Sequence, residues 1–196
     1  MPQPDHIVKI DLPDHQDLDE DIQKYLEICI EKLGMVPNVL TAYTAKPEKF
    51  RTFGKFYNQL MLDEETTNLT KLEREMIAVV VSSANRCYYC LVAHGQAVRA
   101  LSGDPQLGEL MVMNYRVAEL PARQRAMLDY AWKLTKFPHE IGDPDRAALR
   151  QAGFTDGDIF DISDTAAFFN YTNRMAHGLD MMPNAAYHAM DRGGKL

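Results

Sequence analysis

The sequence contains few cysteines, and this scarcity excludes one large class of proteins. Only three occur among the 196 residues, namely Cys29, Cys87 and Cys90. Small secreted domains held together by disulfide bonds need more, so we do not expect such a scaffold. In a reducing compartment, a close pair such as Cys87 and Cys90 is more typical of redox chemistry or metal binding.

Long apolar segments are also missing. The most apolar run, residues 76–84, is far shorter than the roughly 20 residues that a helix needs to span a bilayer. Residues 1–11 carry charges and contain no apolar stretch of signal-peptide length. We therefore expect no membrane partner and a cytoplasmic location.

Positive charge is in the minority. The chain has 21 Lys and Arg against 28 Asp and Glu, which gives a formal net charge of -7. Nucleic-acid-binding proteins usually carry a basic patch or stripe. Here the basic residues are interleaved with acidic ones, as on solvated helix faces. No nucleic-acid partner is expected.

Apolar residues at helical spacing occur along most of the sequence. Apolar residues recur at helical spacing from Asp17 to Leu33, where Gly34 is a stop signal. Thr70 and Glu73 form a capping-box pattern that predicts a helix through the apolar run 76–84. No convincing strand is found. We predict an all-α chain with a single helical domain over residues 1–196 and a frayed tail at 191–196. Further helices are expected from residue 37, at 47–62, 87–101, 105–115, 121–136 and 143–151, and as one or two helices over 155–179.

Two segments share the same spacing. Residues 70–85 and 155–170 both start with Thr, continue with an apolar core and end with Asn. This fits a degenerate duplication, which would give two related helical halves. It also fits the chance similarity of two buried helices, which we favour.

The segment from Glu75 to His94 carries the chemistry. Cys87 and Cys90 lie three residues apart at the start of a predicted helix, where they can close a disulfide. The unpaired N–H groups and partial positive charge of a helix N-terminus favour thiolates, which are the nucleophiles of peroxide attack and disulfide exchange. His94 follows Cys90 by four residues and therefore shares its helix face. It is a candidate general base, and Glu75 on the preceding helix is a candidate to orient it.

The same residues allow a plainer interpretation. Cys87, Cys90, His94 and Glu75 are all possible zinc ligands. No second half-site of the Cys-x-x-Cys type follows, so we favour redox chemistry without a bound metal or cofactor. Cys29 lies in the apolar phase of the first helix and is interpreted as a small core residue.

The pattern Glu75, apolar run, Asn85, Cys87-Tyr-Tyr-Cys90 and His94 resembles the core of alkylhydroperoxidase D and the wider carboxymuconolactone decarboxylase-like superfamily. The resemblance is close over residues 70–101. The stretch 168–174, Phe-Phe-Asn-Tyr-Thr-Asn-Arg, resembles chains described as peroxidase-related.

This resemblance implies an all-helical fold, a homo-oligomer and the reduction of hydroperoxides through a reversible disulfide. It assigns Cys90 as the thiol that attacks peroxide and Cys87 as the resolving thiol, with His94 and Glu75 as a proton relay. An external dithiol of unknown identity would reset the disulfide. The sequence departs from alkylhydroperoxidase D at Tyr89, where that enzyme has His. The alternatives are a decarboxylase or lactone-cleaving enzyme of the same superfamily, and a redox sensor without catalysis.

Overall fold

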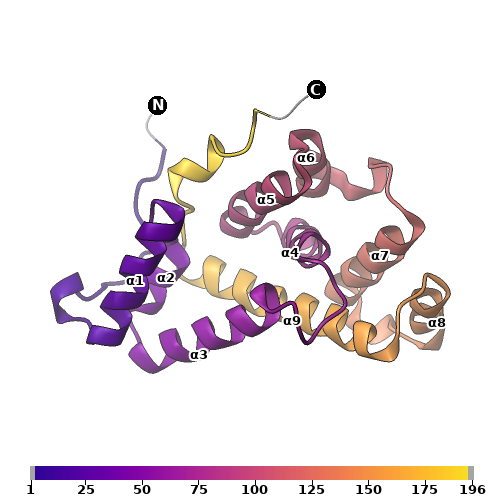
Figure 1. Cartoon of the computed structure of the whole chain (residues 1–196), viewed down its shortest axis with the longest axis horizontal. Helices are drawn as coiled ribbons and strands as arrows, with labels where there is room; N and C mark the ends of the chain where they lie inside the picture. The colour runs from indigo at the N-terminus through magenta and orange to yellow at the C-terminus, as the bar shows by residue number, and fades with distance from the viewer. Residues whose placement is uncertain (1–2, 194–196) are drawn as a thin grey trace.

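The regular structure of the chain is entirely helical over residues 3–193, which are the residues that the computed structural model describes (Figure 1). The all-α prediction is therefore confirmed. No helix in this range is both long and apolar enough to cross a membrane. The α-helices are α1 (Glu20–Leu33), α2 (Asn38–Tyr43), α3 (Pro47–Tyr57), α4 (Lys71–Asn85), α5 (Tyr88–Ser102), α6 (Pro105–Asn114), α7 (Ala122–Lys136), α8 (Asp143–Gln151) and α9 (Asp156–Gly178).

Helix α4 lies at the centre of the molecule, with α5, α6, α7 and α9 packed around it (Figure 1). Its start is the predicted capping box. The backbone N–H of Glu73 donates to Thr70 Oγ1 at 3.1 Å, and the N–H of Thr70 donates to Glu73 Oε2 at 3.0 Å. Residues 76–81 are fully buried, as expected for a helix that is apolar on all sides. The run of valines is thus a core helix and not a strand.

The junction between α4 and α5 sets the position of the cysteines. Arg86 adopts a left-handed conformation with φ 56°, which ends α4 at the predicted break. Cys87 is then the N-cap residue of α5, and Cys90 lies in the first turn. Both thiols are therefore at the start of a helix, as the spacing predicts.

Helices α4 and α9 lie side by side and run in the same direction. Asn68, just before α4, bonds Asp158 in the first turn of α9 at 3.0 Å, and Asn85 at the other end bonds Asn170 at 3.0 Å. The predicted range 155–179 contains one helix, α9, which begins with a capping box like that of α4. The matched spacing thus corresponds to matched local structure, while an internal duplication stays a hypothesis.

The secondary structure differs from the predictions in several details. Residues His15–Asp17 form a separate 3₁₀ turn, because Leu18 and Asp19 have extended backbone angles, so α1 begins at Glu20. Helix α3 ends at Tyr57 and continues as a π-helical turn, Asn58–Leu62. An unpredicted 3₁₀ turn, Ala185–His188, precedes the tail.

The predicted fraying of the tail applies only partly to the described residues. Asp191 accepts a hydrogen bond from Gln96, and Arg192 pairs with Glu109 at 2.9 Å. These contacts hold the described start of the tail against α5 and α6. Residues 194–196 lie outside the described part of the chain.

Candidate active site

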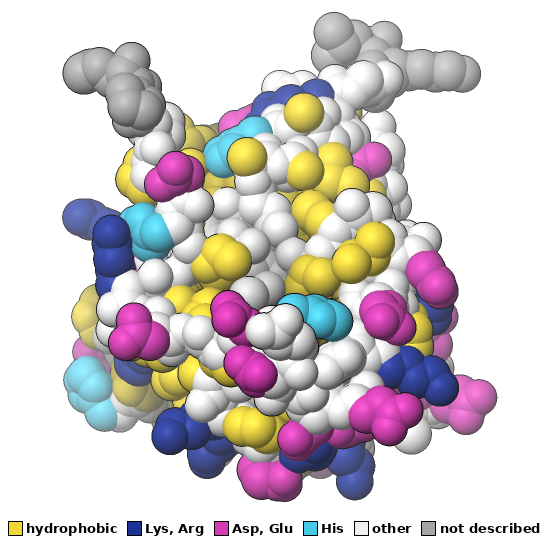
Figure 2. Space-filling view, turned by 90° about the vertical axis from the view of Figure 1, so that its left-hand side faces the viewer, with side chains coloured by type: hydrophobic (Ala, Val, Ile, Leu, Met, Phe, Trp, Pro, Cys, Tyr) yellow, Lys and Arg dark blue, Asp and Glu magenta, His cyan; other side chains and the backbone are white. Residues whose placement is uncertain are grey.

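A cavity of about 510 Å³ opens between α1, α2, α3, α5, α9 and the C-terminal segment. Most of its lining is apolar or aromatic, and its size is within the range of cavities that bind drug-sized molecules. Figure 2 views the side of the molecule formed by α1 and α2, where hydrophobic side chains are interspersed with charged ones. Apolar lining residues include Leu40, Phe53, Phe168, Phe169, Met181 and Met190.

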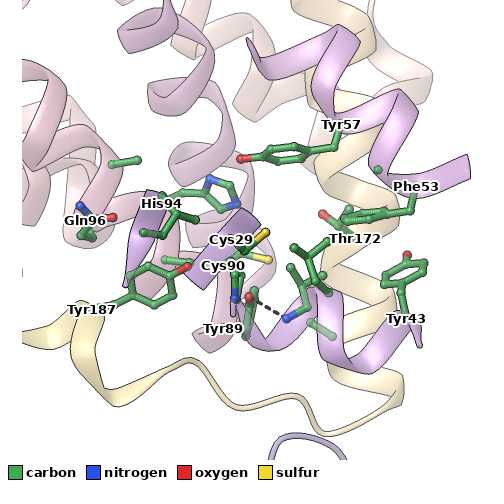
Figure 3. A pocket seen from close by; sticks show the side chains of 18 of the residues that line it. Cys29, Tyr43, Phe53, Tyr57, Tyr89, Cys90, His94, Gln96, Thr172 and Tyr187 are labelled. Carbon is green, nitrogen blue, oxygen red and sulfur yellow. Dashed lines mark hydrogen bonds between the residues drawn. The ribbon is translucent and has the colours of Figure 1, made fainter. Parts of the chain in front are cut away.

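Glu75 and His94 meet at the wall of this cavity (His94 is labelled in Figure 3). Glu75 comes from α4 and His94 from α5, and His94 Nδ1 lies 2.6 Å from Glu75 Oε2. Their side chains are only 10% and 13% exposed. The edge-to-face contact of His94 with Phe169, with ring centroids 4.7 Å apart, further fixes the imidazole. The structure thus brings together two of the predicted site residues.

The two thiols of the predicted pair differ in access. Both side chains are buried, with 1% of Cys87 and 2% of Cys90 exposed. Among the described residues that line the cavity, Cys90 is present and Cys87 is not. A substrate in the cavity would therefore meet Cys90 first. Both cysteines are reduced in this structure.

The pKa values of the two thiols also differ, and the thiol that the cavity does not reach, Cys87, has the lower one. A hydrogen bond from Cys90, with smaller contributions from the backbone N–H of Cys90 and from His177 and His94, lowers the pKa of Cys87 to about 7. The hydrogen bond to Cys87, together with burial, raises the pKa of Cys90 well above its usual value. The pKa of Cys87 is thus lowered and the pKa of Cys90 is raised within the reduced pair.

An amide network lies behind Cys90. Asn85 Nδ2 donates to Asn173 Oδ1 at 2.9 Å, which leaves Asn173 Nδ2 to donate to Ser82 Oγ, also at 2.9 Å. Hydrogen bonds from Asn173 and Ser82 lower the pKa of Cys90 and partly offset the effect of burial. This network orients donor groups toward the sulfur that faces the cavity.

Asn173 and Ser82 are functional candidates that our sequence interpretation missed. Asn173 lies within the stretch 168–174 that resembles peroxidase-related chains, so a signal was present. Nothing in that stretch indicated which side chain would reach the cysteines.

Tyr89 is the position at which the sequence departs from its resemblance to alkylhydroperoxidase D. Its hydroxyl oxygen accepts a hydrogen bond from the backbone N–H of Val39 at 3.0 Å (Figure 3). Burial raises the pKa of Tyr89 well above its usual value, so the side chain stays neutral. Tyr89 therefore anchors the start of α2 to α5, a structural role for this position.

Comparisons with known proteins identify relatives of this chain. Residues 47–131 match the carboxymuconolactone decarboxylase family. An uncharacterized peroxidase-related protein from Silicibacter sp. TM1040 is 59% identical, with a TM-score of 0.93 over 98% of this chain and 100% of that one. The chain belongs to the carboxymuconolactone decarboxylase/alkylhydroperoxidase D-like superfamily. The structure of a second peroxidase-related protein, from Ralstonia eutropha JMP134 and described as an alkylhydroperoxidase AhpD core, is 41% identical, with a TM-score of 0.93 over 99% and 100% of the two chains.

More distant structures share the fold alone. A variant of the debrominase Bmp8, solved in complex with 2,3,4-tribromopyrrole, has a TM-score of 0.76 at 16% identity, over 93% of this chain and 94% of that one. The superfamily fold thus supports more than one chemistry. A comparison with curated proteins found no significant match.

Cys29 packs against the hydrophobic core, as the sequence indicates, but it is only partly buried. It also lines the same cavity as Cys90, because α1 forms one wall. Burial raises the pKa of its thiol, so Cys29 stays protonated and is a weak nucleophile at neutral pH.

His177 on α9 bonds the carbonyl oxygen of Asn85 at 3.2 Å, which is a structural contact.

The described residues contain no group of three or more His, Cys, Asp or Glu side chains arranged to hold a metal ion. His94 Nδ1, one potential ligand atom, is already engaged by Glu75.

Proposed function

We propose that this protein is a thiol-dependent peroxidase that reduces organic hydroperoxides through a reversible disulfide between Cys87 and Cys90. One observation carries the proposal. Cys90 and the His94–Glu75 pair line the same apolar cavity, and Cys87 lies three residues before Cys90 at the start of the same helix. A nucleophile, a base with its orienting group and a resolving thiol are thus assembled at one place.

The first half of the reaction oxidises Cys90. His94 takes the proton of Cys90, and the thiolate attacks the terminal oxygen of the hydroperoxide. The O–O bond breaks, Cys90 becomes a sulfenic acid, and the alkoxide that leaves receives the proton from His94 as an alcohol. The amide network of Asn173 and Ser82 stabilises the negative charge on Cys90 before the attack.

The second half closes the disulfide. Cys87, as a thiolate, attacks the sulfur of the Cys90 sulfenic acid. Hydroxide leaves and takes a proton to form water. An external dithiol then reduces the disulfide and returns both thiols. Overall, one hydroperoxide and one dithiol give one alcohol, one water and one oxidised dithiol.

The cavity favours organic hydroperoxides over hydrogen peroxide. A small polar peroxide would fill little of about 510 Å³ of mostly apolar and aromatic space. An organic substrate with an apolar body would bury that surface, and each buried CH₂ contributes about 0.8 kcal/mol.

The proposal also covers the assembly state of the protein and its location in the cell. Several apolar side chains are exposed, including Leu33, Leu62, Met113 and Phe160. Burying them against a second copy would remove apolar surface from water, so a homo-oligomer is proposed. The cytoplasmic location is proposed from the sequence alone.

The test is steady-state turnover with dithiothreitol or dihydrolipoamide as reductant and cumene hydroperoxide as substrate. We expect alcohol formation in many cycles per protein, and none in the Cys87→Ser/Cys90→Ser double variant. Oxidation that stops after one equivalent, even with a series of protein and small dithiols, would favour a redox sensor. Turnover of a muconolactone without any dithiol would favour the decarboxylase or lactone-cleaving alternative, which does not require the two thiols.

A further inference from the structure

Two tyrosine hydroxyls of the cavity have no protein partner. Among residues 3–193, Tyr57 at the end of α3 and Tyr187 in the C-terminal 3₁₀ turn line the cavity, yet neither hydroxyl makes a hydrogen bond with a described group. The other cavity tyrosines are satisfied. They are Tyr25 with Asn58, Tyr43 with Tyr171, and Tyr89 with Val39.

Tyr187 lines the cavity, and Arg99 holds its backbone in position. Its side chain is buried, with 8% of the residue exposed. Arg99 on α5 is itself buried and donates to the carbonyl oxygens of Tyr187 at 2.8 Å and Met190 at 3.1 Å. This guanidinium fixes the C-terminal segment as one wall of the cavity. Its hydroxyl is not among the fully enclosed unpaired side-chain atoms of the described residues, so it is open to the cavity and can hydrogen-bond a bound molecule.

Both hydroxyls point into the part of the cavity that Cys90 and His94 line (Figure 3). They come from opposite sides, Tyr57 from α3 and Tyr187 from the C-terminal segment. Burial, with a smaller contribution from the Glu75 carboxylate, raises the pKa of Tyr187 to about 12 and the pKa of Tyr57 well above its usual value. Both phenols therefore keep their protons at neutral pH and can act only as neutral hydroxyls.

We propose that Tyr57 and Tyr187 bind the substrate by donating hydrogen bonds to the hydroperoxide oxygen that leaves when Cys90 attacks. The proposal rests on the proposed peroxidase function. It assigns to the cavity a pair of substrate-binding hydroxyls in addition to the thiols and the proton relay.

The chemistry of the attack calls for such donors. The sulfur forms a bond to the terminal oxygen while the O–O bond breaks, so the electron pair moves to the inner oxygen. That oxygen lies on the far side of the attacked atom from Cys90, and it becomes an alkoxide until the proton from His94 arrives. Fixed neutral donors at the place where charge develops stabilise the transition state more than the ground state.

The experiment compares two leaving groups. Stopped-flow oxidation of the reduced protein is measured with cumene hydroperoxide, which releases a basic alkoxide, and with peroxybenzoic acid, which releases a weakly basic carboxylate. The variants are Tyr57→Phe, Tyr187→Phe and the double variant. Tyr43→Phe is the matched control, because it removes a hydroxyl of the same cavity whose partner is another tyrosine. Thermal unfolding and the rate of disulfide reduction by dithiothreitol report on structural damage.

The double variant should lose about 10²-fold in the rate with cumene hydroperoxide, comparable to the loss of an oxyanion-hole donor, and clearly less with the peroxy acid. The single variants should lie between, and Tyr43→Phe should keep the wild-type ratio of the two rates. An unchanged ratio in the double and single variants would overturn the inference while leaving the peroxidase function intact. A wild-type protein that neither peroxide oxidises would overturn both.

Discussion

The Nδ1 atom of His94 lies 2.6 Å from Glu75 Oε2, and this contact determines which nitrogen of the imidazole can accept a proton. An ionised carboxylate can only accept, so Nδ1 carries the hydrogen and Nε2 is left with a free lone pair. The orientation of the ring is fixed in addition by Phe169. This orientation leaves Nε2 available to accept a proton, as the proposed relay requires.

Replacing His94 by Gln should slow oxidation of Cys90 by about 10²–10⁴-fold, the usual effect of losing a general base. Glu75→Gln should give a smaller loss, because the imidazole remains. The raised pKa of Cys90 means that little of it ionises unaided at neutral pH. Stopped-flow rates with cumene hydroperoxide at pH 7 measure the effect. His139→Gln on the exposed surface is the control. Equal rates for wild type and His94→Gln would rule out the relay.

Single cysteine variants should separate the roles of the two thiols. Cys90→Ser should not consume peroxide, because the cavity reaches Cys90 and not Cys87. Cys87→Ser should complete one attack and accumulate a sulfenic acid at Cys90, since the resolving thiol is absent. Trapping with dimedone followed by mass mapping identifies the oxidised residue. A sulfenic acid at Cys87 in Cys90→Ser, formed at the wild-type rate, would reverse the roles.

The pKa of Cys87 should depend on the hydrogen bond from Cys90. In the wild type, Cys87 is thiolate above a pKa of about 7 and becomes protonated as the pH falls through that value. Cys90→Ala removes the donor, so the pKa should rise, whereas Cys90→Ser retains an O–H donor and should raise it less. Thiolate absorbance in the ultraviolet as a function of pH gives the values. The same titration midpoint in all three proteins would contradict the assignment of the hydrogen bond as the main cause.

Asn173 should matter through its hydrogen bond to Cys90. Asn173→Ala should slow peroxide attack by about tenfold or more, because hydrogen bonds to charged groups contribute about 1.5–3 kcal/mol. Asn173→Asp should slow it further, since a carboxylate beside the sulfur opposes a second negative charge. Asn170→Ala, one turn away in the same network, is the comparison for structural damage. Equal oxidation rates for Asn173→Ala and Asn173→Asp would contradict an electrostatic role.

Local signals in the sequence were sufficient for the centre of the fold. The capping box at Thr70, the break at Arg86 and the i, i+4 relation of Cys90 and His94 depend on neighbouring residues only, and all are present in the structure. The pairing of Glu75 with His94 was a hypothesis based on residue types and on a resemblance, and the packing of α4 on α5 provides it.

For three other residues of the cavity, no such local signal indicated their place. Tyr57 and Tyr187 reach the cavity from distant parts of the chain. Their hydroxyls come to line one cavity only because α3 and the C-terminal segment face each other in the fold. Cys29 occupies an apolar position of α1 by periodicity, but periodicity cannot reveal that this face also lines a cavity. Tertiary packing, which spacing does not encode, decides all three positions.

The most direct test of the central claim is a count of thiols combined with mass mapping after exposure of the reduced protein to one equivalent of cumene hydroperoxide. We predict that two of the three thiols disappear and one alcohol forms per chain. The single disulfide should join Cys87 to Cys90 and leave Cys29 free. A disulfide that contains Cys29, or alcohol formation without loss of the thiols of Cys87 and Cys90, would contradict the account.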